Sequence, residues 1–109
     1  MKQWDICEHE FAHGGHPAVV ISPTALVENP DIKVLNVLQC STHRAGRLPA
    51  DNEVMLDTED GLECETLVRC DKILLVLRSE LKAGRGRVIR ERRREIGRKI
   101  IQIFGLLVE

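Results

Sequence analysis

The segment Leu67–Val76 constrains this chain more than any other, because it places two opposite charges inside a run of aliphatic residues. Arg69 and Asp71 are two positions apart, so on an extended strand their side chains point to the same face. Their neighbours Val68 and Cys70 then point to the opposite face. Two explanations fit such a pair: a salt bridge near the end of a strand, or a pair of active-site residues.

Short strands and turns alternate along most of the chain. The first strand alternates only in part and is predicted to be covered on both faces. β-Branched and aliphatic runs predict the other strands, and prolines and glycines predict the connections. The predicted strands are 3–11, 18–22, 33–40, 52–57, 66–71, 73–77 and 87–89, and the predicted loops and turns are 12–17, 23–31, 41–51, 58–61 and 83–86.

The pattern changes to a helical period near the C-terminus. Ile96, Ile100, Ile103 and Leu107 recur at steps of four, three and four residues, which predicts an amphipathic helix over about residues 89–104. The glycine at position 105 is a typical helix stop. No Ser, Thr, Asp or Asn precedes the helix start, which is therefore poorly capped.

Charge is distributed unevenly, although the net charge is −1. Residues 1–80 hold 7 Lys+Arg and 14 Asp+Glu, a balance of −7, and residues 81–109 hold 9 and 3, a balance of +6. The helix arginines, Arg90, Arg94 and Arg98 among them, form either a solvated face or a contact for RNA or an acidic protein partner.

These features predict one domain over residues 1–109, mainly β, built as a small barrel with a helix packed on it. Aromatic residues make up only 3% of the chain, which argues against a single-strand binder that stacks bases on aromatic rings. No apolar run approaches the ~18 residues of a membrane span, and no apolar signal segment follows the first residues. We expect a cytoplasmic protein without membrane contact.

Free thiols are expected for all four cysteines, Cys7, Cys40, Cys64 and Cys70. Cys40 and Cys70 lie in aliphatic segments and are expected to be small buried side chains. Potential zinc ligands are dense near the N-terminus, at Cys7, His9, His13 and His16. The paired short spacings of structural zinc sites are missing, however. We therefore expect no metal and no cofactor.

Four motifs follow one another in an order typical of one protein family. They are Gly15-His16-Pro17-Ala18-Val19-Val20-Ile21-Ser22-Pro23, Leu38-Gln39-Cys40-Ser41-Thr42, Leu67-Val68-Arg69-Cys70-Asp71, and Gly86-Arg87-Val88 followed by the amphipathic helix. With these motifs the chain resembles the MazF/PemK (Kid) family of toxin endoribonucleases from type II toxin–antitoxin systems. The resemblance spans most of the chain and fits a branch with His-Pro where the family usually has Arg-Pro.

The resemblance implies an SH3-like β-barrel, similar to MazF, PemK and CcdB, with a C-terminal amphipathic α-helix. It implies a homodimer that cleaves RNA without a metal ion and is inhibited by a cognate antitoxin protein. It also implies site residues. Asp71 and Arg69 match the Asp and Arg of the PemK branch, and Ser41 with Thr42 matches the family's Ser/Thr position.

Two features of the sequence depart from the family pattern. His16 stands where the family usually has an arginine before the proline. The loop after the first strand is short, so the histidine of the PemK branch has either His13 as its equivalent or no equivalent.

Metal-free RNA cleavage uses the 2′-hydroxyl of the substrate as nucleophile and needs a proton acceptor, a proton donor and stabilisation of the phosphorane. We hypothesise that Asp71 accepts the 2′-hydroxyl proton and that Arg69 binds the phosphate. His16, with an ordinary pKa near ~6.5, acts as acid or second phosphate contact, and Ser41 hydrogen-bonds a phosphate oxygen. The predicted RNA-binding residues are Thr42, His13, His43, Arg44 and Arg47.

Two other functions stay open for such a chain. One is a catalytically silent SH3-like binding module for a protein or nucleic acid partner, and the other is a related toxin that binds a protein target such as a topoisomerase. A binding module has no need for Arg69 and Asp71 on one face, and the Arg-Cys-Asp strand argues against a protein-target toxin. The sequence favours a sequence-selective, metal-independent endoribonuclease (mRNA interferase).

Overall fold

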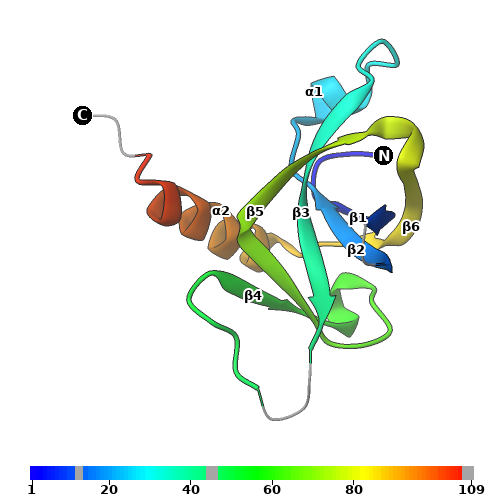
Figure 1. The fold of residues 1–109 in the computed structure, drawn as a ribbon. Coiled ribbons are helices and arrows are strands. Elements are labelled where there is room, and N and C mark those ends of the chain that lie inside the picture. The colour runs from blue at the N-terminus through cyan, green and yellow to red at the C-terminus, as the bar shows by residue number, and fades with distance from the viewer. Residues whose placement is uncertain (12–13, 44–46, 107–109) are drawn as a thin grey trace.

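One antiparallel sheet forms most of the computed structural model, which describes residues 1–11, 14–43 and 47–106 (Figure 1). The sheet has six strands in the order β4-β5-β3-β2-β1-β6. The strand bounds are β1 Asp5–Phe11, β2 Gly14–Val20, β3 Val34–Thr42, β4 Glu53–Leu56, β5 Thr66–Leu77 and β6 Leu81–Arg87. The helices are α1 Thr24–Val27 and α2 Arg90–Phe104, and the 3₁₀ turns are η1 Thr58–Asp60 and η2 Arg78–Glu80. Within the described ranges, no helix is both long and apolar enough to cross a membrane.

The sheet curls so that its two edges, β4 and β6, approach each other. The turn η1 directly follows β4 and lies against β6, where a Cβ atom on Gly86 would lie 2.2 Å from the carbonyl oxygen of Asp60. Only glycine permits this close approach. The predicted mainly β barrel with a C-terminal helix is confirmed, although no β4–β6 pairing closes the sheet in the described part of the chain.

Apolar side chains cover both faces of the sheet. One cluster includes Ile96 of α2, which packs the helix onto this face; its other members are Ile6, Val19, Leu38, Cys40, Val54, Leu56, Leu62, Val68, Cys70 and Val88. The second cluster includes Val27 of α1 and contains Cys7, Ala18, Val20, Leu35, Val37 and Val76. Because β1 contributes Ile6 to one cluster and Cys7 to the other, the prediction that both of its faces are covered is confirmed.

The C-terminal helix agrees with its predicted period and end. Ile96 is fully buried, and Gly105 ends the helix in the left-handed conformation with φ of 62°. Ile103 is 40% exposed, so the apolar stripe leaves the core in the last turns, and Leu107 lies outside the described residues. The prediction of free cysteines with Cys40 and Cys70 buried is confirmed.

Predictions based on glycine and proline are wrong in three places. Residues 14–17, predicted as a loop, belong to β2 because they pair with β1. Residues 83–86, predicted as a turn, belong to β6, and the strand predicted over residues 87–89 does not form, because β6 ends at Arg87 and Ile89 directly precedes α2. Two glycines with positive φ angles lie where the register between β1 and β6 shifts. Pairing with β1 outweighs the preference of these glycines for turns. Residues 23–31 contain the short helix α1, which begins after Pro23.

Two strand boundaries also differ from those predicted. Ser41 and Thr42, predicted to begin a loop, extend β3 because they pair with β5. The predicted strands 66–71 and 73–77 form the single strand β5. Gly61 has the positive φ expected for the 58–61 turn, at 87°.

Candidate active site

An irregularity in β5 lies at the predicted pair of charges. Leu38 pairs with Ile73 and Cys40 pairs with Val68, so a step of two residues on β3 corresponds to a step of five on β5. The extra residues of β5 form a bulge. A bulge bends its strand and re-aims side chains, and bulges are common next to active sites.

Arg69 and Asp71 form a two-point ion pair in this bulge. Arg69 Nε donates to Asp71 Oδ1 at 2.9 Å, and Nη2 donates to Oδ2 at 2.7 Å. This confirms that the two side chains lie together. Hydrogen bonds from Arg69, opposed by burial and aided by the side chain of Asn52, lower the pKa of Asp71 to about 2. Asp71 is thus ionised and a weak base while the pair is intact.

A second two-point ion pair joins Arg47 to Glu53. Arg47 Nη1 and Nη2 each donate to one oxygen of the Glu53 carboxylate at 2.8 Å, and the Ala50 N–H donates to Oε1 at 2.9 Å. The Glu53 side chain is only 5% exposed. The hydrogen bonds from Arg47, against the effect of burial, lower its pKa to about 2.

The two pairs lie next to each other on one face of the sheet. Glu53 is the β4 residue opposite Arg69 of β5, and cross-strand partners point to the same face. Arg47, Glu53, Arg69 and Asp71 therefore form a row of alternating charge, which we call the charge row. Glu53 and Asn52 were not among the site residues predicted from the sequence. One sequence feature could have indicated Glu53: it is a charged residue in the predicted strand, on the face opposite to that of the apolar residues Val54 and Leu56.

Four predicted site residues line one open pocket of about 500 Å³: His16, Ser41, Thr42 and Arg47. His16 comes from β2, the two hydroxyl residues come from the end of β3, and Arg47 comes from the β3–β4 connection. Arg69 and Asp71 are not among the described lining residues. Arg47 is the residue that connects the pocket to the charge row.

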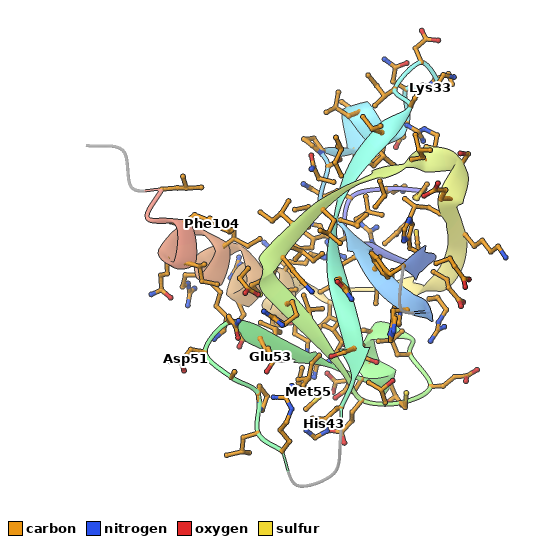
Figure 2. All side chains as sticks on the ribbon, in the orientation of Figure 1. Lys33, His43, Asp51, Glu53, Met55 and Phe104 are labelled. Atoms are coloured by element: carbon orange, nitrogen blue, oxygen red, sulfur yellow. The ribbon has the colours of Figure 1, made fainter. Side chains whose placement is uncertain are left out.

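His43 supports the connection that carries Arg47. Its backbone N–H donates to the Glu65 carbonyl oxygen at 3.0 Å, and its Nδ1 lies 3.8 Å from a Glu65 carboxylate oxygen. Its Nε2 contacts the carbonyl oxygen of Arg47. Figure 2 shows His43 where β3 enters the connection, with Glu53 and Met55 on β4 beyond it. His43 thus contacts the connection that carries Arg47 and is not among the described residues lining the pocket.

His16 has an aromatic neighbour on β1. The Phe11 and His16 ring centroids are 6.4 Å apart, and the His9 ring centroid is 4.4 Å from that of Phe11. His9 is buried, and its Nε2 lies 3.1 Å from Glu80 Oε2. Strand pairing places His9 directly opposite His16, so a packed group of rings supports the pocket residue.

The remaining predicted site residues, His13 and Arg44, lie outside the described residues. No group of three or more His, Cys, Asp or Glu side chains within the described ranges could hold a metal ion. Burial raises the pKa of the Cys40 thiol well above its usual range and that of Cys70 to about 11. These thiols are protonated near neutral pH and are poor nucleophiles.

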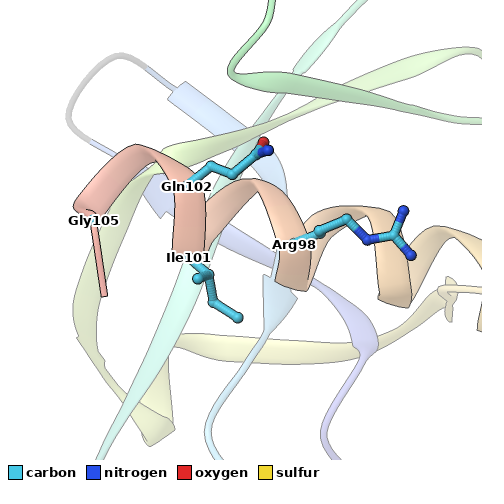
Figure 3. A pocket seen from close by; sticks show the side chains of 4 residues that line it. All are labelled: Arg98, Ile101, Gln102 and Gly105. Carbon is cyan, nitrogen blue, oxygen red and sulfur yellow. The ribbon is translucent and has the colours of Figure 1, made fainter. Parts of the chain in front are cut away.

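A second hollow lies on α2. Arg98, Ile101, Gln102 and Gly105 line it, and its volume is about 620 Å³ (Figure 3). These positions follow Arg90 and Arg94 at helical spacing, so an arginine stripe continues into an apolar groove. None of the four lining residues belongs to the pocket or to the charge row.

The fold matches solved structures of toxins at low sequence identity. An endoribonuclease from a mycobacterial species, solved with its cognate antitoxin, matches with a TM-score of 0.82 at 17% identity, covering 100% of this chain and 99% of that chain. The Mycobacterium tuberculosis toxin MazF-mt6 matches with a TM-score of 0.80 at 18% identity, covering 95% and 99%. A chain of the MazE-MazF structure from Deinococcus radiodurans matches with a TM-score of 0.74 at 19% identity, covering 98% and 97%. At these identities the matches show a shared fold.

Sequence comparison gives the family directly. No curated protein matches the sequence significantly. The family model of the PemK-like, MazF-like toxins of type II toxin–antitoxin systems, in contrast, matches residues 2–104. That range takes in the pocket, the charge row and α2, and the chain therefore belongs to the PemK-like, MazF-like family of toxins.

Proposed function

We propose that this toxin is a sequence-selective, metal-independent endoribonuclease (an mRNA interferase) that acts in the cytoplasm. The observation that carries the proposal is the position of the pocket next to the charge row. Hydroxyl, imidazole and guanidinium groups line the pocket, and Arg47 leads from it through Glu53 to the Arg69–Asp71 pair. This combination offers phosphate contacts, a proton donor and a proton acceptor within one face.

The arginines and hydroxyls of this face suit an RNA backbone. A guanidinium presents a planar fork that matches phosphate oxygens, and the hydroxyls of Ser41 and Thr42 can donate to the same group. Because aromatic residues are scarce, base recognition rests on hydrogen bonds and charge rather than on stacking. His13 and Arg44 remain predicted contributors to that recognition.

Cleavage proceeds by attack of the 2′-oxygen on the adjacent phosphorus. The 2′-O–P bond forms and the P–O5′ bond breaks, which leaves a 2′,3′-cyclic phosphate and a 5′-hydroxyl. Asp71 accepts the 2′-hydroxyl proton, and His16 donates a proton to the departing 5′-oxygen. Positioned acid and base groups of this kind each contribute ~10²–10⁴-fold.

Arg69 has to exchange partners during this reaction. In the free protein its hydrogen bonds hold the pKa of Asp71 at about 2. When the guanidinium moves to the phosphate, that pKa rises and Asp71 becomes a better base. The pair is accessible enough for such an exchange, with 36% of the Arg69 side chain and 29% of the Asp71 side chain exposed.

We expect a homodimer in which an aliphatic surface of β5 and β3 is covered. This surface, which we call the aliphatic row, consists of Val34, Ile73, Leu75 and Leu77. Each of the four side chains is at least 39% exposed, and Val34 pairs with Leu77 across the strands. Contiguous apolar surface of this kind marks a protein–protein contact.

A cognate antitoxin is the second expected partner. The arginine stripe of α2 ends at Arg98, which lines the groove together with Ile101 (Figure 3). A segment with acidic side chains and at least one apolar side chain complements this surface in charge and polarity. We expect the antitoxin to present such a segment to α2.

An RNA cleavage assay in EDTA tests the proposed activity. Purified protein and its Asp71→Asn variant are incubated with a long mixed-sequence RNA, and the cut ends are mapped. We expect discrete cuts by the wild type and a loss of at least about 10²-fold in the variant, because the proton acceptor is removed. Asp31→Asn, in the exposed connection between α1 and β3, serves as the matched control and should cleave like the wild type.

Intact RNA after incubation with folded wild-type protein would contradict the proposal. The binding-module function would then explain the fold, and the Arg69–Asp71 pair would be a structural salt bridge. Equal cleavage by the wild type and the Asp71→Asn variant would leave the activity in place but remove Asp71 from the mechanism.

A further inference from the structure

We infer that Glu53 is a positioning residue, which keeps hold of Arg47 while Arg47 contacts a phosphate of the RNA. This inference rests on the proposed function and adds a residue to its site. It also predicts that the two arginine–carboxylate pairs behave differently: the Arg47–Glu53 pair stays closed when RNA binds, whereas the Arg69–Asp71 pair opens.

The geometry of the Arg47–Glu53 pair leaves part of the guanidinium available. The carboxylate takes one N–H from Nη1 and one from Nη2, in an end-on arrangement. A guanidinium has five N–H groups, and Nη1 also donates to the Leu48 carbonyl oxygen at 3.4 Å. The N–H of Nε and the outer N–H of Nη2 can therefore serve a second anion. Arg47 is 46% exposed and lines the pocket, which gives an RNA phosphate access to these groups.

Burial of the carboxylate disfavours the alternative, in which phosphate displaces Glu53. The Glu53 side chain is 5% exposed and accepts its hydrogen bonds from Arg47 and from the Ala50 N–H. Removing Arg47 would leave a buried charge without its main partner, which is strongly unfavourable. Asp71 has 29% of its side chain exposed, so water can replace Arg69 at far lower cost.

Glu53 also fixes where Arg47 can be. Its carboxylate binds both the guanidinium of Arg47 and the backbone N–H of Ala50. These hydrogen bonds hold both ends of the segment 47–50 against the first residue of β4. Without this tie, Arg47 would sample many rotamers, and an oriented phosphate contact would become an averaged one.

Binding of a non-cleavable RNA tests the inference separately from catalysis. Dissociation constants are measured for a 2′-O-methyl version of the cleaved sequence, or for a mixed 2′-O-methyl pool if no cut is found. The proteins are the wild type, Glu53→Gln and Glu63→Gln, a matched change at an exposed glutamate. We expect about tenfold weaker binding by Glu53→Gln, the effect of one oriented charge-assisted contact, and unchanged binding by Glu63→Gln. For cleavable RNA, KM should rise about tenfold while kcat changes less than about twofold.

A double-mutant cycle separates positioning from a merely structural role. If Glu53 acts through Arg47, Glu53→Gln should weaken binding in the wild type but have no further effect in an Arg47→Ala background. This background also covers the case in which a single variant fails to fold, because Arg47→Ala/Glu53→Gln removes both charges together.

Four results would overturn the inference. Tighter binding by Glu53→Gln would show that the carboxylate masks Arg47. Unchanged binding, or an equal loss in the Arg47→Ala background, would show that Glu53 does not act through Arg47. A wild type that binds no RNA would overturn the inference together with the proposed function. A wild type that binds RNA without cleaving it would refute only the proposed catalysis, and the comparison of Glu53→Gln with the wild type would still decide the inference.

Discussion

Two carboxylates of the charge row have the same chemistry but different surroundings. Asp71 is partly exposed in the β5 bulge, and Glu53 is buried at the start of β4. An exposed ion pair contributes about 0–1 kcal/mol to stability, whereas loss of one partner from a buried pair costs about 3–5 kcal/mol. The same residue types therefore give one pair that can open at low cost and one whose opening is costly.

This difference predicts unequal effects of removing each arginine. Arg47→Ala should lower the free energy of unfolding more than Arg69→Ala does, because Glu53 is left buried and without its partner. Arg69→Ala should lower it by about 1 kcal/mol or less. Urea unfolding measures both, with Arg94→Ala on the exposed side of α2 as the control. Equal losses for the two arginines would contradict the assignment, and Glu53→Gln should restore most of the stability lost in Arg47→Ala.

The same carboxylates predict how stability depends on pH. Their pKa values fall from ordinary values of 4.5 for Glu53 and 3.8 for Asp71 to about 2 in the folded protein. A lowered folded-state pKa gives stability that is fully present above the unfolded-state pKa and is lost as the pH falls toward the folded-state pKa. Both contributions should therefore decline between about pH 4.5 and pH 2.

Urea midpoints measured over this acid range check the prediction. The Glu53→Gln variant should show a shallower decline than the wild type, because one of the two titrating groups is gone. The exposed-site variant Glu63→Gln should follow the wild type. A Glu53→Gln curve parallel to that of the wild type would show that Glu53 does not carry this pH dependence.

At the scale of elements, η1 explains how α2 begins without a local cap. Asp60 Oδ1 accepts from the Ile89 N–H at 2.9 Å, immediately before the first turn. Arg92, in the first turn, donates to Asp57 at 2.8 and 3.1 Å and also contacts Asp60. The aspartates neutralise an arginine that would otherwise oppose the helix dipole. Asp57 and Asp60 of the same chain thus supply negative charge at the start of α2.

Two variants in η1 test this corner. Asp60 is 1% exposed, so Asp60→Asn should cost about 2–4 kcal/mol of stability by leaving Arg92 with a weakened partner in a buried site. Glu59→Gln lies in the same turn, but the Glu59 side chain is 67% exposed and 3.7 Å from Arg92, so it should change stability by less than about 0.5 kcal/mol. Thermal unfolding followed by circular dichroism measures both, and similar shifts would contradict a special role of Asp60.

A pair of glycines tests the contact between η1 and β6. Gly86→Ala would place a Cβ 2.2 Å from the Asp60 carbonyl oxygen, and such overpacking should cost about 1–3 kcal/mol or more. Gly97→Ala is the matched control, because no atom lies within 4 Å of its added Cβ. In the helix interior it should stabilise the protein by up to about 1 kcal/mol. Urea unfolding measures both changes in stability, and a change in the same direction for the two variants would contradict this explanation.

At the scale of the whole molecule, the apolar surface is concentrated where partners are expected. The aliphatic row lies on β3 and β5, and the last turns of α2 expose Ile101, Ile103 and Phe104. Figure 1 shows α2 extending away from the curled sheet, with its last turn on the side away from β6. An isolated chain leaves these side chains in water, which costs hydrophobic free energy that an interface would recover.

The expected dimer can be tested at its most exposed aliphatic strand position. Leu75 is 65% exposed, and Leu75→Lys would place a charge within the proposed interface. Sedimentation equilibrium should show a dimer for the wild type and a monomer for this variant. The control Leu26→Lys changes an exposed leucine on α1 and should leave the dimer intact. A wild-type monomer, or a Leu75→Lys dimer, would exclude the aliphatic row as the interface.

Part of the site could be predicted before any tertiary information. Arg69 and Asp71 meet because they are two residues apart in one strand, which is a local relation. His16, Ser41 and Arg47 were each predicted near the site, and they line one pocket. Glu53 was missed because its role depends on the β4–β5 register and on a connection that returns Arg47 to β4. Both relations bring together residues that are separated in the sequence, and the local sequence pattern does not show that they are close in space.

The sequence by itself determined the period of α2 and its end at Gly105, the apolar strands, the burial of Cys40 and Cys70, and the Arg69–Asp71 neighbourhood. Each of these depends on residues that are close together in the chain. Only the tertiary structure decided that residues 14–17 and 83–86 are strands, since pairing with β1 outweighs the turn preference of glycine and proline. It also decided which carboxylate meets which arginine. Strand register, the β5 bulge and burial set those partners, and they separate the Arg47–Glu53 pair from the Arg69–Asp71 pair.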